Sequence, residues 1–213
     1  MPVQRDHLRQ GDESAFQIPD RIPVFPLPNV VFFPKTYLPL HIFEPRYREM
    51  VADAAAQGQC IGMALLKEGW EEDYYGNPPI FQTGCVGRLV KLERLADGRA
   101  NILLYGLCRY DIVQEFYEKS YREAAIALRP SSAADVLDPS LRQSLIDAAP
   151  AYLGRQAEET RALDETIVNG LATFLDLTPL EKQFLLEAET LPQRARRLRD
   201  VIELKTGRPE AKG

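Results

Sequence analysis

The spacing of apolar residues along the chain changes near Pro130. Before this point, short runs rich in β-branched and aromatic residues alternate with glycines and prolines, a pattern typical of strands joined by turns. After it, apolar residues recur three and four positions apart, as on the buried face of a helix. The sequence therefore predicts an α+β protein with a β-rich first part and a helical second part.

This change of pattern divides the protein into predicted segments. Residues 1–20 carry no periodic apolar pattern and are expected to form a flexible leader. Residues 21–130 are predicted to form a β-rich subdomain, and residues 131–206 a helical subdomain. Residues 207–213 remain as a short tail.

Within the β-rich segment, the apolar runs of strand length cover residues 22–27, 30–33, 36–43, 60–67, 84–95, 99–106, 107–116 and 121–128. Prolines interrupt the earliest of these runs, and proline cannot donate a hydrogen bond to a neighbouring strand. We therefore expect short or edge strands there. The Asp97-Gly98 pair predicts a hairpin turn. Further glycines stand where a strongly curved sheet would bend, which favours a partly closed barrel over a flat sheet; they are Gly84, Gly87 and Gly106.

Residues 44–58 interrupt the strand pattern and predict one amphipathic helix. Pro45 suits a first helical turn, and Gly58 supplies a C-terminal stop. The apolar positions at helical spacing, expected to face the core, are Tyr47, Met50, Val51 and Ala54.

The second part predicts helices over residues 139–160, 164–175, 179–188 and 191–205. Two of them have clear N-terminal signals. Thr178 with Glu181, and Thr190 with Gln193, have the spacing of a capping box. Gly207 fits a C-terminal cap of the last helix.

Charge and cysteine content narrow the class of protein. The formal net charge is −5, so no overall positive field exists to hold a polyanion. The 3 cysteines form no close pair, which favours a reducing compartment over a disulfide framework. No run of 18 apolar residues and no secretory signal is present. We therefore expect a soluble, cytoplasmic protein.

Motifs for common catalytic chemistries are missing from the sequence. No glycine precedes a Lys-Ser or Lys-Thr pair, as a phosphate-binding loop requires, and no serine has glycine beside it, as a hydrolase elbow requires. Only His7 and His41 supply imidazole. We predict no catalytic, cofactor-binding or metal-binding residues. His41 could be paired with Glu44 or Cys60, but a hydrogen-bonded, structural role is expected for it. The arginines of residues 194–199 are expected on a solvated helix face.

Residues 22–51 carry a specific resemblance to a known family. The run includes Phe25-Pro26-Leu27, Val31-Phe32-Phe33-Pro34 and Leu38-Pro39-Leu40-His41-Ile42-Phe43-Glu44-Pro45-Arg46-Tyr47-Arg48. It closely resembles the N-terminal, substrate-binding domain of Lon proteases. Later stretches around residues 84–110 and 169–198 are similar to the same domain, so the resemblance covers about residues 20–206. Lys35 departs from the pattern, because family members usually carry glycine there.

The resemblance implies a β-rich, PUA-like pseudobarrel followed by a helical bundle, in agreement with the two parts predicted above. A Lon protease adds an ATPase module and a Ser-Lys protease domain, and the sequence ends before either could begin. We therefore expect a free-standing, Lon-like protein that is not an enzyme and acts without ATP in protein quality control. Its expected partners are unfolded or exposed polypeptide segments, or a partner protein.

The candidate binding surface is a loop over residues 68–79, which holds the only tryptophan of the protein among acidic residues. Aromatic side chains give large contact areas at low entropy cost, although Trp70 and the tyrosines could instead fold back as a lid on the barrel. The run after the third strand adds candidates that could also be structural. Together the candidate protein-binding residues are Trp70, Tyr74, Tyr75, Phe43, Glu44, Arg46 and Tyr47.

RNA binding is the alternative function, because PUA-like barrels occur in proteins associated with RNA modification. An RNA-binding face requires clustered cations among aromatic residues, whereas the aromatic loop here is acidic. The sequence therefore favours protein binding, with no nucleic acid or membrane partner expected.

Overall fold

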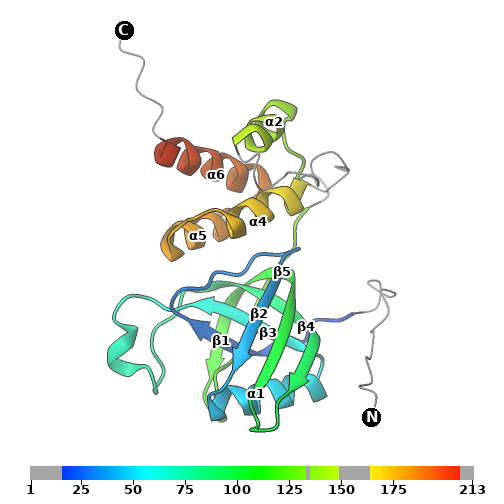
Figure 1. Ribbon diagram of the computed structural model, residues 1–213, viewed down its shortest axis with the longest axis vertical. Coiled ribbons are helices and arrows are strands. Elements are labelled where there is room, and N and C mark those ends of the chain that lie inside the picture. Colours follow the sequence, from blue (N-terminus) through cyan, green and yellow to red (C-terminus); the bar gives the residue numbers. More distant parts are fainter. Residues whose placement is uncertain (1–15, 133–134, 149–163, 207–213) are drawn as a thin grey trace.

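The computed structural model describes residues 16–132, 135–148 and 164–206. Figure 1 shows its two parts: a curved sheet with one helix at its far end, and a group of helices at the opposite end. The strands all precede residue 130 and the remaining α-helices all follow residue 138. The fold is thus α+β, with a pseudobarrel followed by a helical bundle, as the sequence predicts.

The six strands of the sheet are β1 (Arg21–Leu27), β2 (Tyr37–Ile42), β3 (Cys60–Leu65), β4 (Thr83–Arg94), β5 (Ala100–Phe116) and β6 (Glu123–Arg129). They are ordered β2-β5-β4-β3-β1-β6, and a further β5–β6 pairing returns the sheet to β5. Only β1 and β3 pair in parallel. Because the pairings from β5 through β4, β3, β1 and β6 return to β5, the sheet closes on itself and leaves β2 outside the ring.

Strand β5 is a single strand of 17 residues, although the sequence predicts two runs that meet at Gly106. A register shift against β4 falls at this position. The backbone of Phe33 passes close to Gly106, so a side chain would not fit here: a Cβ atom on Gly106 would lie 2.2 Å from the carbonyl oxygen of Phe33. Gly106 also accepts a hydrogen bond from the Lys35 amide, at 2.8 Å, so it bends the strand without ending it.

The predicted strand over residues 30–33 is wrong, since this segment is irregular in the structure. It lies between Pro28 and Pro34, which cannot donate to a sheet. The side chains of Val31, Phe32 and Phe33 are nevertheless buried, and they alternate between two cores: Phe32 packs in the barrel, and Val31 and Phe33 pack among the helices. Lys35 follows with a φ of 63°, in the left-handed region where glycine is the usual residue.

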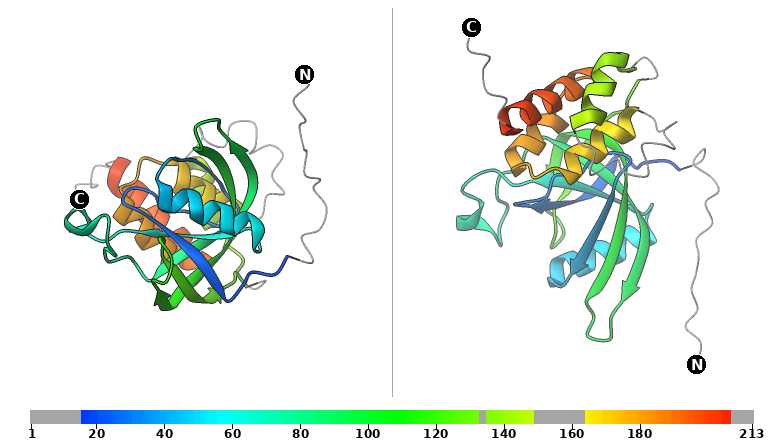
Figure 2. Two further views of the ribbon diagram at one scale, coloured as in Figure 1. Left: turned by 90° about the horizontal axis from the view of Figure 1, so that it is seen from below. Right: turned by 45° about the horizontal axis from the view of Figure 1, so that its top comes forward.

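Helix α1 (Pro45–Ala56) closes the end of the barrel away from the bundle, as Figures 1 and 2 show. Pro45 opens it, and Gly58, with a φ of 79°, follows its end. Its buried face confirms the prediction, because it consists of Tyr47, Met50, Val51 and Ala54. These side chains join a core with residues from β1, β4 and β5.

The bundle contains α2 (Pro139–Ala148), α4 (Asp164–Phe174), α5 (Pro179–Leu186) and α6 (Leu191–Thr206). The predicted capping box of α5 is confirmed in both directions, at 2.6 and 3.2 Å between Thr178 and Glu181. The second predicted box forms only in part. The Gln193 amide donates to Thr190, but the Gln193 side chain accepts from the Glu189 amide instead. The predicted continuation of the first helix over residues 149–160, and Gly207, lie outside the described residues.

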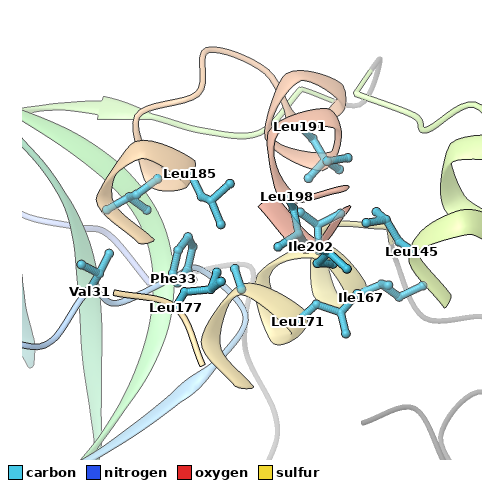
Figure 3. Close-up of a cluster of buried hydrophobic side chains, with 14 of the residues drawn as sticks. Val31, Phe33, Leu145, Ile167, Leu171, Leu177, Leu185, Leu191, Leu198 and Ile202 are labelled. Carbon is cyan, nitrogen blue, oxygen red and sulfur yellow. The ribbon is translucent and has the colours of Figure 1, made fainter. Parts of the chain in front are cut away.

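The bundle docks on the barrel through a shared apolar core, drawn in Figure 3. Val31 and Phe33 from the barrel side meet the leucines of the helices. Polar contacts cross the same interface. The Asn169 amide donates to the Pro34 carbonyl at 2.9 Å, and the Gln183 amide donates to the Thr83 carbonyl at 3.0 Å. The two parts are therefore joined by one continuous interior.

Two buried arginines hold this interface. Arg109 of β5 donates to the carbonyls of Leu186, the last residue of α5, and of Ala188 and Glu189 just beyond it. Arg194 of α6 donates to the Leu185 carbonyl at 3.1 Å and to Asn169 at 2.7 Å. Burial lowers the pKa of both guanidiniums. The sequence prediction of a solvated face is thus wrong for Arg194, because its apolar neighbours Ala195 and Leu198 turn this part of the helix inward.

Replacing Arg109 tests how much the docking of the bundle depends on this side chain. We expect Arg109→Met to lower the free energy of unfolding by about 3 kcal/mol, because it leaves buried carbonyls without a donor. Urea unfolding followed by circular dichroism measures the change. Arg99→Met is the matched control in the exposed hairpin, where we expect a change within about 1 kcal/mol. Equal effects of the two substitutions would contradict the prediction.

Candidate functional site

A pocket of about 200 Å³ opens on the side of the barrel. One wall is the aromatic loop, residues 68–79, which Figure 1 shows projecting from the barrel. The other wall is the β5–β6 connection, residues 117–122, and α1 contributes its first turn. The aromatic residues that line it are Tyr47, Tyr74, Tyr75, Tyr117 and Tyr121, and the cationic ones are Arg46, Lys119 and Arg122.

Glu44 ties the aromatic loop to the start of α1. Its carboxylate accepts a hydrogen bond from the Tyr74 hydroxyl at 2.5 Å and another from Arg46 Nε at 3.0 Å. Arg46 also donates to the Tyr74 carbonyl, at 3.2 Å. We call this set of three residues the Glu44 clamp. Partial burial and the Glu44 carboxylate raise the pKa of Tyr74, so the phenol keeps its proton and remains a donor.

Arg46 also organises the tyrosines around it. Its guanidinium carbon lies 4.6 Å from the ring centre of Tyr47, 5.0 Å from that of Tyr74 and 5.8 Å from that of Tyr75. These are cation–π distances, although only the closer two rings contribute strongly. Within the run Phe-Glu-Pro-Arg-Tyr, which carries the family resemblance, residues 44–47 therefore supply both the start of α1 and the support of the aromatic loop.

Trp70 occupies the base of the aromatic loop rather than its surface. It lies in a short 3₁₀ helix, Trp70–Asp73, and packs against Leu66, Ile80 and other buried residues of the barrel. Its ring meets Tyr74 edge to face at 5.5 Å. Tyr75, in contrast, is 86% exposed. Trp70 thus anchors the loop, and Tyr75 is the aromatic side chain most available for contact.

Phe43 stands apart from the other candidates. It is exposed, it does not line the pocket, and its ring stacks with His41 at 6.3 Å. His41 itself pairs with the side-chain oxygen of Asn101, at 2.8 Å between Nδ1 and Oδ1. His41 thus has the hydrogen-bonded, structural role expected for it, and its partner is Asn101 rather than Glu44 or Cys60, because the register of β2 against β5 places Asn101 opposite His41.

The β5–β6 connection is held against α1 by a second set of polar contacts. Lys119 donates to Asp53 at 2.7 Å and to the Tyr121 hydroxyl at 2.8 Å, and that hydroxyl donates to Asp53 at 2.7 Å. The hydrogen bonds from Lys119 and Tyr121 lower the pKa of Asp53. Ser120 adds a bond to Glu49 of the same helix, at 2.7 Å.

Arg122 lies deepest in this wall. Its side chain is 4% exposed, pairs with Glu115 at 3.2 Å and donates to the Pro78 carbonyl at 2.8 Å. It thereby joins the two walls of the pocket. The sequence prediction did not include residues 117–122, although tyrosines alternate there with Lys119 and Arg122, a pattern that could have indicated them.

Other chemistry is limited in the part of the protein that the structure describes. No group of His, Cys, Asp or Glu there could hold a metal ion. Burial raises the pKa of the Cys60 thiol to about 12 and that of Cys85 well above its usual value, so neither is a thiolate at neutral pH. Among the described helices, none has the length and apolar content needed to span a membrane.

A pseudobarrel with a helical bundle docked at one end and a tyrosine-lined pocket on its side defines a two-part α+β domain. The chain belongs to the ATP-dependent protease La (LON) substrate-binding domain family, whose model matches residues 21–203. This match confirms the family resemblance inferred from the sequence. It concerns a substrate-binding domain, and no catalytic domain is part of it.

Curated relatives are whole Lon proteases. Lon protease 2 of Myxococcus xanthus is 25% identical over 199 residues, which cover 88% of this chain and 24% of that protein. A Lon protease of Parabacteroides distasonis is 27% identical over 202 residues, with 89% and 24% covered. The chain therefore spans about a quarter of the length of these relatives.

Solved structures show the same fold. The Lon N-terminal domain protein from Xanthomonas campestris superposes with a TM-score of 0.66 at 20% identity, covering 84% of this chain and 96% of that one. The N-terminal domain of the Mycobacterium avium complex Lon protease gives a TM-score of 0.63 at 17% identity, covering 86% and 98%. At these identities the comparison establishes the architecture alone.

The Glu44 clamp predicts how the aromatic loop responds to mutation. We expect Glu44→Ala to loosen the loop, because it removes the acceptor shared by Tyr74 and Arg46, while global stability falls by only about 1 kcal/mol. Trp70 is the only tryptophan in the protein, so its fluorescence reports on this loop alone. We predict stronger acrylamide quenching of Trp70 in the variant. Glu93→Ala, at an exposed position of β4, is the control, and unchanged quenching in Glu44→Ala would refute the prediction.

Proposed function

We propose that this protein is a non-catalytic binding module that recognises polypeptide, either unfolded segments or an exposed segment of a partner protein, in an ATP-independent role in protein quality control. Membership of a family of substrate-binding domains supports this proposal. The observation that carries it is the pocket between the aromatic loop and the β5–β6 connection, lined by tyrosines and supported by the family motif.

The lining residues suit contact with a peptide. Tyr75 and Tyr117 present exposed rings at the pocket, and tyrosine gives a large contact area with few rotatable bonds. The Glu44 clamp and Trp70 fix the loop before any ligand arrives, which reduces the entropy lost on binding. The walls are thus prepared for binding, with the exposed tyrosines as contact residues and Trp70 as a support.

The first test is fluorescence anisotropy of a labelled, permanently unfolded polypeptide titrated with the purified protein. We expect saturable binding of the unfolded polypeptide and none of a folded control. Tyr75→Ala is expected to weaken binding by about tenfold while changing the free energy of unfolding by less than about 0.5 kcal/mol, because the side chain is exposed. Tyr37→Ala, at an exposed position outside the pocket, should leave affinity unchanged.

The Trp70→Ala variant tests whether Trp70 supports the aromatic loop or contacts the ligand directly. If Trp70 supports the loop, the variant loses stability, and binding falls only as far as the loop is disordered. A loss of stability with unchanged affinity would count against a role of the aromatic loop in binding. Competition by RNA in the same titration tests the alternative function, and salt-dependent binding of RNA in place of the unfolded polypeptide would overturn the proposal.

A further inference from the structure

The charge of the pocket differs in sign from that of the whole protein. The formal net charge of the protein is −5, yet the lining contains Arg46, Lys119 and Arg122 and no acidic residue. Each cation has a carboxylate partner, but these partners are Glu44, Asp53 and Glu115, none of which lines the pocket. Each of these carboxylates pairs with a lining cation without lining the pocket itself, so the lining residues that carry a formal charge are all positive.

These cations keep donors beyond those that the protein uses. An arginine has five N–H donors and a lysine ammonium three. Lys119 uses two of its donors, on Asp53 and Tyr121. Arg122 forms an ion pair through Nε with Glu115 and donates through Nη2 to the Pro78 carbonyl, and its Nη1 has no hydrogen-bond partner within the described residues, although the side chain is only 4% exposed. A buried guanidinium with an unused donor is costly unless an acceptor completes it.

Among the described residues with a buried, unpaired side-chain nitrogen or oxygen, Arg122 is the one that lines the pocket. The other buried side-chain atoms without a partner among the described residues, Arg109 Nε, Gln183 Oε1 and Arg194 Nη2, belong to residues at the interface between barrel and bundle, and none of those residues lines the pocket. Beside Arg122 lies Tyr117, which is 51% exposed and whose ring centre is 5.8 Å from the guanidinium carbon. Tyr117 and Arg122 both line the pocket, so a ligand in the pocket would lie against this guanidinium.

The chemistry of the lining favours a carboxylate. Donors on charged groups form their strongest hydrogen bonds with anionic acceptors, and arginine matches a carboxylate in shape. The volume of about 200 Å³ lies below the range usual for small-molecule sites and suits one side chain or the terminal residue of a peptide.

The rim of the pocket favours a single anionic group over a polyanion. The aromatic loop carries Glu71, Glu72 and Asp73, all exposed, beside the tyrosines that line the pocket. A nucleic acid would place successive phosphates near these carboxylates, whereas a peptide can present one carboxylate between neutral or basic residues. A polypeptide therefore fits this combination of charges better than RNA.

We propose that the pocket binds a carboxylate of the polypeptide ligand, from an aspartate or glutamate side chain or from the terminal carboxylate of a polypeptide, with Arg122 and Lys119 as its donors and the tyrosines holding the adjacent residues. This inference rests on the proposed function and specifies which segments the module selects. It explains why an acidic protein gathers cations without lining carboxylates at one place.

The test compares labelled peptides that share an apolar, aromatic core. One has a central glutamate and an amidated end, the second has glutamine in its place, and the third has glutamine with a free terminal carboxylate. With the unmodified protein, we expect each carboxylate source to strengthen binding about tenfold over the neutral peptide, as one charge-assisted hydrogen bond supplies. The two carboxylate peptides then tell which source the pocket prefers.

Variants connect the selectivity to the pocket. Lys119→Met and Arg122→Gln should reduce the carboxylate preference toward one, while Arg122→Lys should retain part of it. Because Arg122 is buried, thermal unfolding accompanies each titration, and Lys119→Met, at a more exposed position, carries the test if Arg122→Gln does not fold. Arg99→Gln, outside the pocket, is the control that should keep the full preference.

The outcomes separate the two proposals. Equal binding of all three peptides would overturn the carboxylate inference and leave the polypeptide-binding function standing. Failure of all three to bind, with the unfolded polypeptide also unbound, would overturn both. Carboxylate preference that persists unchanged in Lys119→Met and Arg122→Gln would place the anion site elsewhere and overturn the inference for this pocket.

Discussion

Strand β5 is the constraint on which the rest of the structure depends. It pairs with β2 and β4 along its first part and with β6 along its last, so the ring of strands closes only because this one strand is long enough to serve both sides. Its middle carries Arg109 to the carbonyls at and just beyond the C-terminal end of α5, which fixes the bundle to the barrel. Its end leads directly into the β5–β6 connection that forms one wall of the pocket. Barrel closure, bundle docking and the position of the candidate site are therefore consequences of the same strand, bent at Gly106 where the Phe33 backbone leaves no room for a side chain.

Part of the family motif stabilises the fold, and another part holds the aromatic loop at the candidate site. Pro45 and Tyr47 start α1 and bury its first turn, so part of the motif serves the fold. Glu44 and Arg46 face the aromatic loop and hold it by hydrogen bonds and cation–π contacts. A loop with so few buried side chains of its own would otherwise have low local stability. Because Trp70 anchors its base and the Glu44 clamp its end, Tyr75 is held in place while remaining exposed.

Much of the fold and part of the candidate site could be predicted from the sequence. The predictions succeed for segments whose structure is decided by their own local pattern. The buried face of α1 and the capping box at Thr178 follow from spacing alone, and both are found. The predictions fail where contacts with distant segments of the chain decide the structure or the partner of a residue. Residues 30–33 have strand-like composition, yet two flanking prolines and two competing cores leave them irregular. Arg194 belongs to a run that looks solvated, but the docking of α6 buries it. His41 pairs with Asn101, a partner 60 residues away that only the register of β2 and β5 reveals. The tyrosines and cations of residues 117–122 are visible in the sequence, but only the fold shows that they lie opposite the aromatic loop.

The buried arginines of this protein have two different roles, one in the fold and one at the pocket. Arg109 and Arg194 are buried where barrel and bundle meet, and backbone carbonyls and Asn169 accept hydrogen bonds from two of the three side-chain nitrogens of each, so these arginines hold the two parts together. Arg122 is buried to a similar degree and also joins two segments, through Pro78 and Glu115. It differs because it lines a pocket that holds further cations and no carboxylate. An arginine at the interface between barrel and bundle stabilises the fold. The unused N–H donor of Arg122, in contrast, can donate to an acceptor on a ligand in the pocket. The same desolvation that makes such a group costly in the free protein makes an arriving acceptor effective, which links the stability of the pocket wall to ligand selection.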